Sequence, residues 1–336
     1  MPQLRQNLAT KQWVVISTER ARRPHSLSEL QPCQPPDLPS YDPRCPFCAP
    51  EERPGEVEVL RLPENGPWQV RIVRNRYPAL APEGDLERHF SGVERWMTGL
   101  GYHEIVIEGP RHDLSPARAD SDMLYLTLLA FQRRGLMLEQ DRRMVYIQYF
   151  KNHGAAAGAS LDHPHSQLIA LPVVPGTRRQ RAEEARRYCD ERGGCVFCAM
   201  LADELRLQSR LVAVNESAAA FVLYAALSPF HIWVLPRRHL ANFLEAEPED
   251  IRAVAVCLHQ VLWALDRGLN NPAYNYVLHS CPLHDCGREY LHWYITVVAR
   301  ISTMAGFEMG TGMYINPTLP EESAAFLAHI LADYPS

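Results

Sequence analysis

The sequence predicts an α+β protein built from two tandem copies of one unit, each a mostly antiparallel sheet with a helix packed on it. Its 336 residues are enough for about two domains. A Cys-x-Phe-Cys motif occurs twice, at residues 45–48 and 195–198. Each motif is followed by strand-like segments, one long amphipathic helix pattern and a strand that carries a histidine, which indicates an internal duplication.

The first half contains five predicted strands, where apolar residues alternate or run together. These are residues 13–16, 70–73, 103–108, 145–150 and 168–171. Apolar side chains from Leu124 to Leu138 recur at helical spacing and predict a helix over residues 121–140. The Pro-, Ser- and Gln-rich residues 26–44 and the Gly/Ala-rich residues 152–160 are expected to form loops.

An arginine- and glutamate-rich segment at residues 178–191 predicts a solvated helix or linker. We place a domain boundary there, which gives domains 1–177 and 178–336. The second half then has a predicted helix over residues 249–267, ended by Gly268. A last helix runs through residues 326–331, with its cap at Thr318 or a neighbour. The predicted strands of this half are residues 220–225, 230–235, 274–279 and 292–298.

Charge and hydropathy exclude two classes of protein. The chain has 34 Lys and Arg against 39 Asp and Glu, a net charge of −5, which argues against a protein that coats nucleic acid. No apolar run approaches the roughly 20 residues that span a bilayer, so no membrane partner is expected. Residues 1–5 lack a hydrophobic signal core, and we expect a cytoplasmic protein, in which C-x-x-C pairs are metal or redox sites.

The two cysteine motifs predict two zinc sites as the cofactor of this chain. Zinc takes four Cys or His ligands in tetrahedral geometry. The predicted ligand sets are Cys45, Cys48, His112 and His163, and Cys195, Cys198, His239 and His292. His103 and His231 lie near His112 and His239 and are alternatives. Buried thiols or a redox pair are the other interpretations, but a redox pair needs a cysteine at a helix N-terminus, and no helix is predicted close behind either pair.

The tripeptide His163-Pro164-His165 indicates chemistry beyond metal binding. In an extended segment, residues two apart share a face. The second half keeps the first histidine, as His292, but has Tyr294 in place of the second. We therefore assign the shared histidine to zinc and His165 to catalysis. A neutral imidazole can attack phosphorus and form a phosphoimidazolide.

Groups that bind phosphate lie on either side of these histidines in the sequence. The small residues of the 154–160 loop let backbone N–H groups approach phosphate oxygens. Gln167 is expected to donate to a bound phosphoryl oxygen. The basic cluster Arg20, Arg22 and Arg23 is either a solvated turn or a further phosphate-binding element.

Taken together, residues 152–167 closely resemble galactose-1-phosphate uridylyltransferases, which are nucleotidyl transferases of the histidine triad superfamily, and the likeness runs over essentially the whole chain. The resemblance implies two histidine-triad-like units. It also implies that His165 becomes nucleotidylated, that Gln167 stabilises the covalent intermediate and that Asn75 contacts the nucleoside. By the same resemblance, the phosphate contacts come from Asn152, Gly158, Ala159, Ser160 and the arginines Arg20 and Arg23. A sugar-phosphate loop is implied at Phe307, Glu308, Gly310 and Tyr314.

One position departs from the pattern of the more familiar members of that family, which read His-Pro-His-Gly-Gln. Ser166 stands at the glycine position, and together with residues 171–175 and Gly310-Thr311-Gly312 it resembles a branch that includes ADP-glucose phosphorylases. Our first expectation is a UDP-glucose:galactose-1-phosphate uridylyltransferase of carbohydrate metabolism, acting on a nucleotide sugar and a sugar 1-phosphate, with a homodimer as its assembly. The alternatives are an ADP-glucose phosphorylase and, outside enzymes, a zinc-knuckle binding module.

Overall fold

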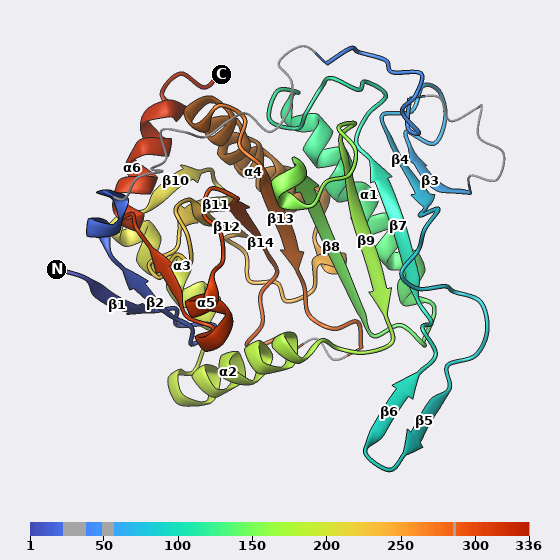
Figure 1. Ribbon diagram of the computed structural model, residues 1–336, viewed down its shortest axis with the longest axis horizontal. Helices are drawn as coiled ribbons and strands as arrows, with labels where there is room; N and C mark the ends of the chain where they lie inside the picture. Colours follow the sequence, from blue (N-terminus) through green and yellow to red (C-terminus); the bar gives the residue numbers. More distant parts are fainter. Residues whose placement is uncertain (23–37, 49–56, 285–286, 336) are drawn as a thin grey trace.

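A single large sheet forms the centre of the molecule. The computed structural model describes residues 1–22, 38–48, 57–284 and 287–335. The strands of this sheet are β3 (Glu58–Leu62), β4 (Val70–Arg74), β7 (Tyr102–Ile107), β8 (Tyr146–His153), β9 (His165–Leu171), β10 (Leu211–Val214), β11 (Ala218–Val222), β12 (His231–Pro236), β13 (Tyr274–His279) and β14 (Tyr294–Ala299). The sheet has ten strands, and every neighbouring pair is antiparallel (Figure 1).

The strand order is the same in both halves of the chain. From its outer edge inward, the first half runs β3-β4-β7-β9-β8 and the second runs β10-β11-β12-β14-β13. The two inner strands, β8 and β13, pair with each other, with Phe150 opposite Val277. The predicted α+β fold with two tandem units is confirmed. The domain boundary proposed after residue 177 falls inside helix α2 (Gly176–Arg192), which connects the halves.

Two long helices cover one face of the sheet. Helix α1 (Ser121–Glu139) packs on β3 and β4, helix α4 (Pro248–Leu269) packs on β10, β11 and β12, and the two helices contact each other. In Figure 1 they lie behind the strands. Leu124, Leu128 and Phe131 of α1 are fully buried, because the apolar stripe of the helix faces the sheet.

Alternation along the strands places the predicted catalytic residues on the opposite face. In β9, Leu168 and Ala170 belong to the core beneath the helices. His165 and Gln167 have the other parity and point away from that core. On their side a second cluster contains Ile105 and Ile107 of β7, together with Cys45 and Phe47.

Smaller elements surround this sheet. A three-stranded sheet joins the two ends of the chain, because β2 pairs with both β1 and β15. A two-stranded hairpin, β5 and β6, projects from the body at the lower right of Figure 1. The bounds are β1 (Gln3–Gln6), β2 (Trp13–Ile16), β15 (Tyr314–Asn316), β5 (Arg88–Ser91), β6 (Glu94–Met97), α3 (Val196–Leu207), α5 (Gly306–Thr311) and α6 (Pro320–Leu331), with 3-10 turns at Thr18–Arg22, Ala155–Ala157 and Phe243–Glu245.

Two local predictions were wrong. Gly268 does not end α4, which continues to Leu269 and is capped by Asn270 in the left-handed conformation. Gly268 instead allows α6 to approach, since a Cβ there would lie 2.7 Å from the ring of Phe326. A helix also begins within the second cysteine pair, because α3 starts at Val196 with Cys195 as its N-cap and contains Cys198.

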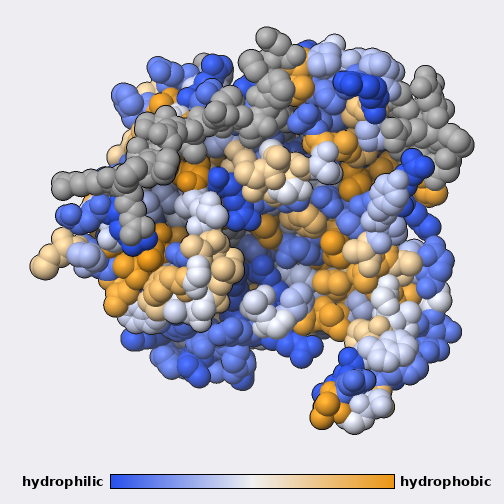
Figure 2. Space-filling model, in the orientation of Figure 1, coloured by the Kyte–Doolittle hydropathy of each residue, from blue (hydrophilic) through white to orange (hydrophobic). Residues whose placement is uncertain are grey.

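The surface in front of the sheet is uneven. Figure 2 shows a hollow near its middle, with hydrophilic side chains visible in the depth, and a strongly hydrophilic surface along α2 below it. No helix in the described ranges has both the length and the hydropathy needed to cross a bilayer.

Candidate active site and metal-binding groups

His165 opens β9 and is 5% exposed. Its Nδ1 lies 2.8 Å from the carbonyl oxygen of His163, and because a carbonyl can only accept, Nδ1 carries the proton. Burial, and then the charge of Lys151, hold the pKa of His165 below its usual value. The ring is therefore neutral near pH 7. Its Nε2 has no hydrogen-bond partner among the described residues and keeps its lone pair, as a nucleophile requires.

A buried ion pair lies directly beneath the histidine. Lys151 of β8 donates to Glu108 at 2.5 Å and to the carbonyl oxygen of His165 at 3.0 Å. Tyr276 of β13 donates to the other oxygen of Glu108 at 3.1 Å. Lys151 and Glu108 are 1% and 0% exposed. The sequence does not predict this pair, because Glu108 and Lys151 come together only through the pairing of β7 and β8 with β9.

The predicted phosphate loop begins where β8 ends, beside His165. Asn152 lies two residues beyond Phe150, which is opposite Gln167, and Gly158 turns the chain with a left-handed φ of 88°. Asn275 of β13 reaches across from the second half and donates to the side-chain oxygen of Asn152 at 2.8 Å and to Ala157 O at 2.9 Å. Ala159 and Ser160 follow the turn, and Ser160 is exposed. Asn275, from the second half of the chain, thus holds the conformation of the loop through two hydrogen bonds.

Gln167 and Asn75 both contact His103. The side-chain oxygen of Gln167 is 2.9 Å from His103 Nε2, and Asn75 Nδ2 is 3.1 Å from the same nitrogen. Asn75 also lines a cavity of about 100 Å³ with Tyr102 and His103. The structure thus brings a predicted nucleoside contact and a predicted catalytic residue to the ring of His103, which the sequence indicates only as an alternative zinc ligand.

The predicted sugar-phosphate loop stands apart from His165 within one chain. Phe307, Glu308 and Gly310 form α5, and Tyr314 begins β15, on the left in Figure 1, whereas β8 and β9 lie in the right half. Arg20 is near this group, because its charge contributes to lowering the pKa of Glu308, after the larger effect of a backbone hydrogen bond. Arg23 lies outside the described residues.

The first predicted zinc set converges on one point. Single ligand atoms of Cys45, Cys48, His112 and His163 all lie within 4.8 Å of one another. Cys48 Sγ is 3.4 Å from His112 Nδ1 and 3.3 Å from His163 Nδ1, close to the spacing of tetrahedral zinc ligands. His163 Nε2 lies 2.9 Å from Gly109 O, which leaves Nδ1 as the lone-pair atom. These residues fit a zinc ion.

The second set brings three of its four predicted members together. Ligand atoms of Cys195, Cys198 and His239 lie within 4.8 Å of one another, with Cys198 Sγ 3.2 Å from His239 Nδ1. His292 is not part of that group. Its Nδ1 is 2.8 Å from Trp293 O, which leaves Nε2 as the nitrogen that could bind a metal. Its ring nevertheless lies 5.5 Å from that of His239, and its buried Nε2 has no hydrogen-bond partner within the described part of the chain. An unpaired imidazole nitrogen beside two thiols fits a metal site, and His292 as fourth ligand stays a prediction.

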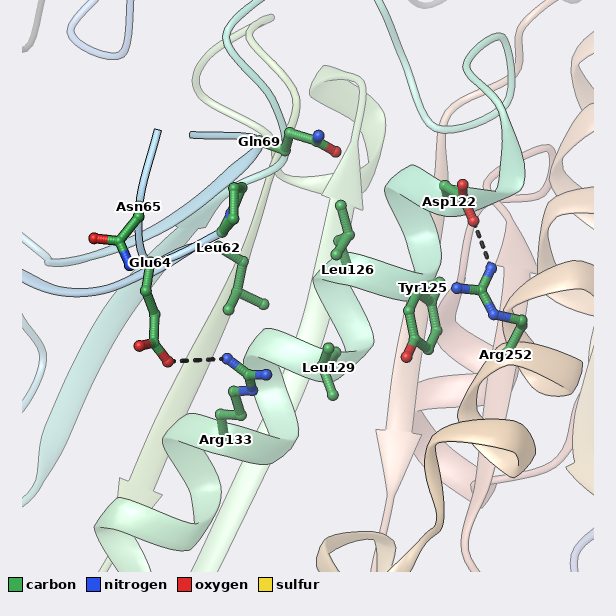
Figure 3. Close-up of a pocket in the computed structure, with 11 residues that line it drawn as sticks. Leu62, Glu64, Asn65, Gln69, Asp122, Tyr125, Leu126, Leu129, Arg133 and Arg252 are labelled. Atoms are coloured by element: carbon green, nitrogen blue, oxygen red, sulfur yellow. Dashed lines mark hydrogen bonds and ion pairs between the residues drawn. The ribbon is translucent and has the colours of Figure 1, made fainter. Parts of the chain in front are cut away.

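A further cavity lies away from these residues. It has a volume of about 550 Å³ and lies between α1, α4 and the β3–β4 connection (Figure 3). Both arginines that line it are paired, Arg133 with Glu64 and Arg252 with Asp122. Arg252 also stacks on Tyr125 at 3.9 Å. The cavity therefore offers no unpaired arginine to an anionic substrate.

Known proteins resemble this chain along nearly its whole length. Residues 1–175 match the family model "Galactose-1-phosphate uridyl transferase, N-terminal domain", and residues 117–333 match a domain of unknown function, DUF4921. An ADP-glucose phosphorylase of Arabidopsis thaliana is 36% identical over 98% of this chain and 93% of its own length. A galactose-1-phosphate uridylyltransferase of Thermotoga maritima is 26% identical over 96% and 97%.

Solved structures give the same relationship. The crystal structure of an ADP-glucose phosphorylase from Arabidopsis thaliana with bound ADP-glucose superposes with a TM-score of 0.82 at 32% identity, over 98% of both chains. A uridylyltransferase structure superposes with a TM-score of 0.75 at 27% identity, over 100% of both chains. The likeness therefore extends over both halves of the molecule.

Proposed function

The chain belongs to the galactose-1-phosphate uridylyltransferase family of nucleotidyl transferases, and we propose that it transfers the adenylyl group of ADP-glucose to orthophosphate through His165. Adenylyl transfer takes precedence over uridylyl transfer, the first expectation from the sequence, because the relative with 36% identity is an ADP-glucose phosphorylase. The observation that carries the chemistry is the neutral His165, with Nδ1 bonded to His163 O and Nε2 unbonded among the described residues.

Two lines of support favour adenylyl over uridylyl transfer. Identity to the Arabidopsis ADP-glucose phosphorylase is 36%, against 26% for the Thermotoga uridylyltransferase, and the TM-scores of the corresponding kinds of structure are 0.82 and 0.75. Ser166 and Gly310-Thr311-Gly312 resemble the phosphorylase branch as well. Uridylyl transfer remains the second candidate, because the family model that matches residues 1–175 describes uridyl transferases.

The reaction runs in two balanced steps. His165 Nε2 attacks the α-phosphorus of ADP-glucose, an N–P bond forms, and the P–O bond to glucose 1-phosphate breaks. Orthophosphate then attacks the adenylyl-histidine, the N–P bond breaks, and ADP leaves with Nε2 free again. His163 O accepts from Nδ1–H throughout and stabilises the charge that the ring acquires.

The groups around His165 prepare this transfer. Lys151 donates a hydrogen bond to the backbone carbonyl of His165. Its positive charge stabilises the negative charge that develops on the phosphoryl oxygens. Gln167 has an amide N–H₂ group without a partner among the described residues, and we assign it to one of those oxygens. Asn152 and residues 158–160 are assigned to the phosphates, and Asn75 to the nucleoside.

Zinc has a structural role in this proposal. Cys45, Cys48, His112 and His163 would hold one ion, and Cys195, Cys198, His239 and His292 a second. The first ion would link Cys45 and Cys48 to His163, which lies two residues before His165. A structural zinc of this kind contributes directly to the free energy of folding. His163 O is the hydrogen-bond acceptor of His165, so the ion would also hold the nucleophile's orientation.

Both substrate groups are needed at one site, which favours a homodimer. Phe307, Glu308, Gly310, Tyr314 and Arg20 are assigned to the sugar phosphate, yet α5 and β15, which carry the first four, lie away from β9 in Figure 1. We infer that a second copy supplies them. Mixing inactive His165→Ala chains with inactive Tyr314→Ala chains should restore activity, and no restoration after verified subunit exchange would count against the shared site.

Initial-rate kinetics test the proposed reaction. With ADP-glucose and orthophosphate both varied, we expect parallel double-reciprocal lines. Labelled glucose 1-phosphate should also be incorporated into ADP-glucose when no orthophosphate is present. The first step alone releases glucose 1-phosphate, and its reversal takes up the label. The same assays with UDP-glucose and galactose 1-phosphate should be slower. A reversed preference would favour uridylyl transfer, and intersecting lines without exchange would reject both.

A further inference from the structure

His103 of β7 lies beside Gln167 and has a fixed tautomer. The two residues are 64 positions apart in the chain and meet because β7 pairs with β9. His103 Nδ1 accepts a hydrogen bond from the backbone N–H of Ala79 at 3.1 Å. A backbone N–H cannot reverse its role, so Nδ1 is unprotonated and the proton of the neutral ring is on Nε2.

That proton orients the Gln167 side chain. The acceptor 2.9 Å from His103 Nε2 is the side-chain oxygen of Gln167. Asn75 Nδ2 is 3.1 Å from the same nitrogen but cannot donate to it, and the orientation of Asn75 is fixed because its oxygen accepts from Tyr77 N–H at 2.9 Å. The hydrogen bond of His103 Nε2–H therefore goes to Gln167.

Resting on the function proposed above, we propose that His103 is a positioning residue that makes Gln167 a hydrogen-bond donor in the transfer step. With its oxygen held by His103, Gln167 must turn its N–H₂ group away, toward the face it shares with His165. Reversing the amide would place two donors against each other and lose the bond. The chain thus presents N–H groups, and not an oxygen, to the phosphoryl group as it gains charge.

Two matched variants separate this role from a structural one. Asn at position 103 matches the Nδ1 side of the ring and can still contact Ala79, but it is too short to reach Gln167. Gln matches the Nε2 side and can still donate to Gln167, but it loses the contact with Ala79. Under this proposal His103→Asn forms the His165 adduct slowly, whereas His103→Gln forms it almost as fast as the wild type. If His103 acted only by holding Ala79, His103→Gln would be the slower variant.

The experiment follows formation of the His165 adduct in a single turnover with saturating ADP-glucose. We expect H103N to slow the step by about tenfold, the equivalent of one hydrogen bond, with KM within about twofold. H103Q should stay within about threefold of wild type. The double variant H103N/Q167A should be no slower than Q167A alone, because His103 acts through Gln167.

A third substitution tests the donor role itself. Gln167→Glu keeps the acceptor for His103 but turns an oxygen toward the phosphoryl group, so it should be slower than Q167A. Equal or faster adduct formation by Q167E would overturn the inference, as would H103N at wild-type rate, H103Q as slow as H103N, or additive losses in the double variant. An absence of adduct in the wild-type protein would instead reject the proposed function.

Discussion

The ring of Phe47 lies 5.5 Å from the ring of His165. Phe47 is the apolar residue of the first cysteine motif, and its ring is also 5.8 Å from His163. The second half repeats the contact, with the ring of Phe197 5.2 Å from that of Tyr294, which stands where the first half has His165, the proposed nucleophile. Each cysteine motif thus packs on the strand that begins at this position, and only the first half has a histidine there.

Loss of the first zinc site is expected to disorganise the nucleophile. Cys45→Ser should lower zinc content by about one ion per chain and lower the unfolding temperature, because metal binding is coupled to folding. The matched variant Cys195→Ser should lose a similar amount of zinc yet slow adduct formation less, since its knuckle contacts Tyr294. Elemental analysis, thermal unfolding and adduct kinetics check this. Unchanged zinc in both variants would contradict the assigned ligands.

The two histidines of the tripeptide should differ in their effects. His165→Ala is expected to lower kcat by about 10⁴-fold or more while stability and zinc content persist, because the equivalent position in the second half is Tyr294 without loss of fold. His163→Ala should lower zinc content and stability, since it removes a ligand. Substantial turnover by His165→Ala would refute its role as nucleophile.

The buried pair beneath His165 should be costly to break. Lys151→Met leaves the carboxylate of Glu108, which is 0% exposed, without its charged partner, and we expect a loss of about 3–5 kcal/mol in the free energy of unfolding. The double variant Lys151→Met/Glu108→Gln removes the buried charge and should recover part of that loss. Urea unfolding measures both. A single variant as stable as wild type would show that the pair is not buried as described.

Acid should destabilise the fold through buried neutral histidines. Burial, followed by the charge of Lys151, lowers the pKa of His153 to about 4, from about 6.5 in the unfolded chain. The unfolded state therefore takes up a proton first as the pH falls, so this group's contribution is complete above pH 6.5 and is lost toward pH 4. Between pH 8 and pH 5 it amounts to about 2 kcal/mol.

The variant His153→Gln isolates that contribution, because Gln does not titrate and can still reach Asn271, the present partner of the ring. Its free energy of unfolding should fall less than that of wild type between pH 8 and pH 5. Identical pH profiles for the two proteins would contradict the assignment.

The elements that the sequence predicted well are those with strong local periodicity. Helix α1 was expected over residues 121–140 and spans Ser121–Glu139, because its apolar stripe repeats without interruption. Helix α3 was missed since Cys195, its N-cap, makes no side-chain capping bond. The hairpin β5–β6 was missed because exposed residues such as Phe90, Val93 and Trp96 leave no inward-facing apolar pattern.

In the candidate site, too, residues with a local sequence signal could be predicted, and contacts between distant strands could not. Comparing the two halves of the sequence singled out His165, because the repeat keeps His163 as His292 and loses its neighbour. The contact between His103 and Gln167 could not be predicted, since it depends on the register of β7 against β9, where Ile105 is opposite Gln167. Lys151 and Glu108 likewise meet through sheet packing across 43 positions.

Intact-protein mass spectrometry, followed by peptide mapping, tests the central claim most directly. After mixing with ADP-glucose in the absence of orthophosphate, the account predicts one adenylyl group per chain on His165, removed when orthophosphate is added and absent from His165→Ala. UDP-glucose should label the protein more slowly. A uridylyl adduct that forms faster than the adenylyl one would contradict the proposed donor, and an unlabelled His165 with every donor would contradict the covalent mechanism.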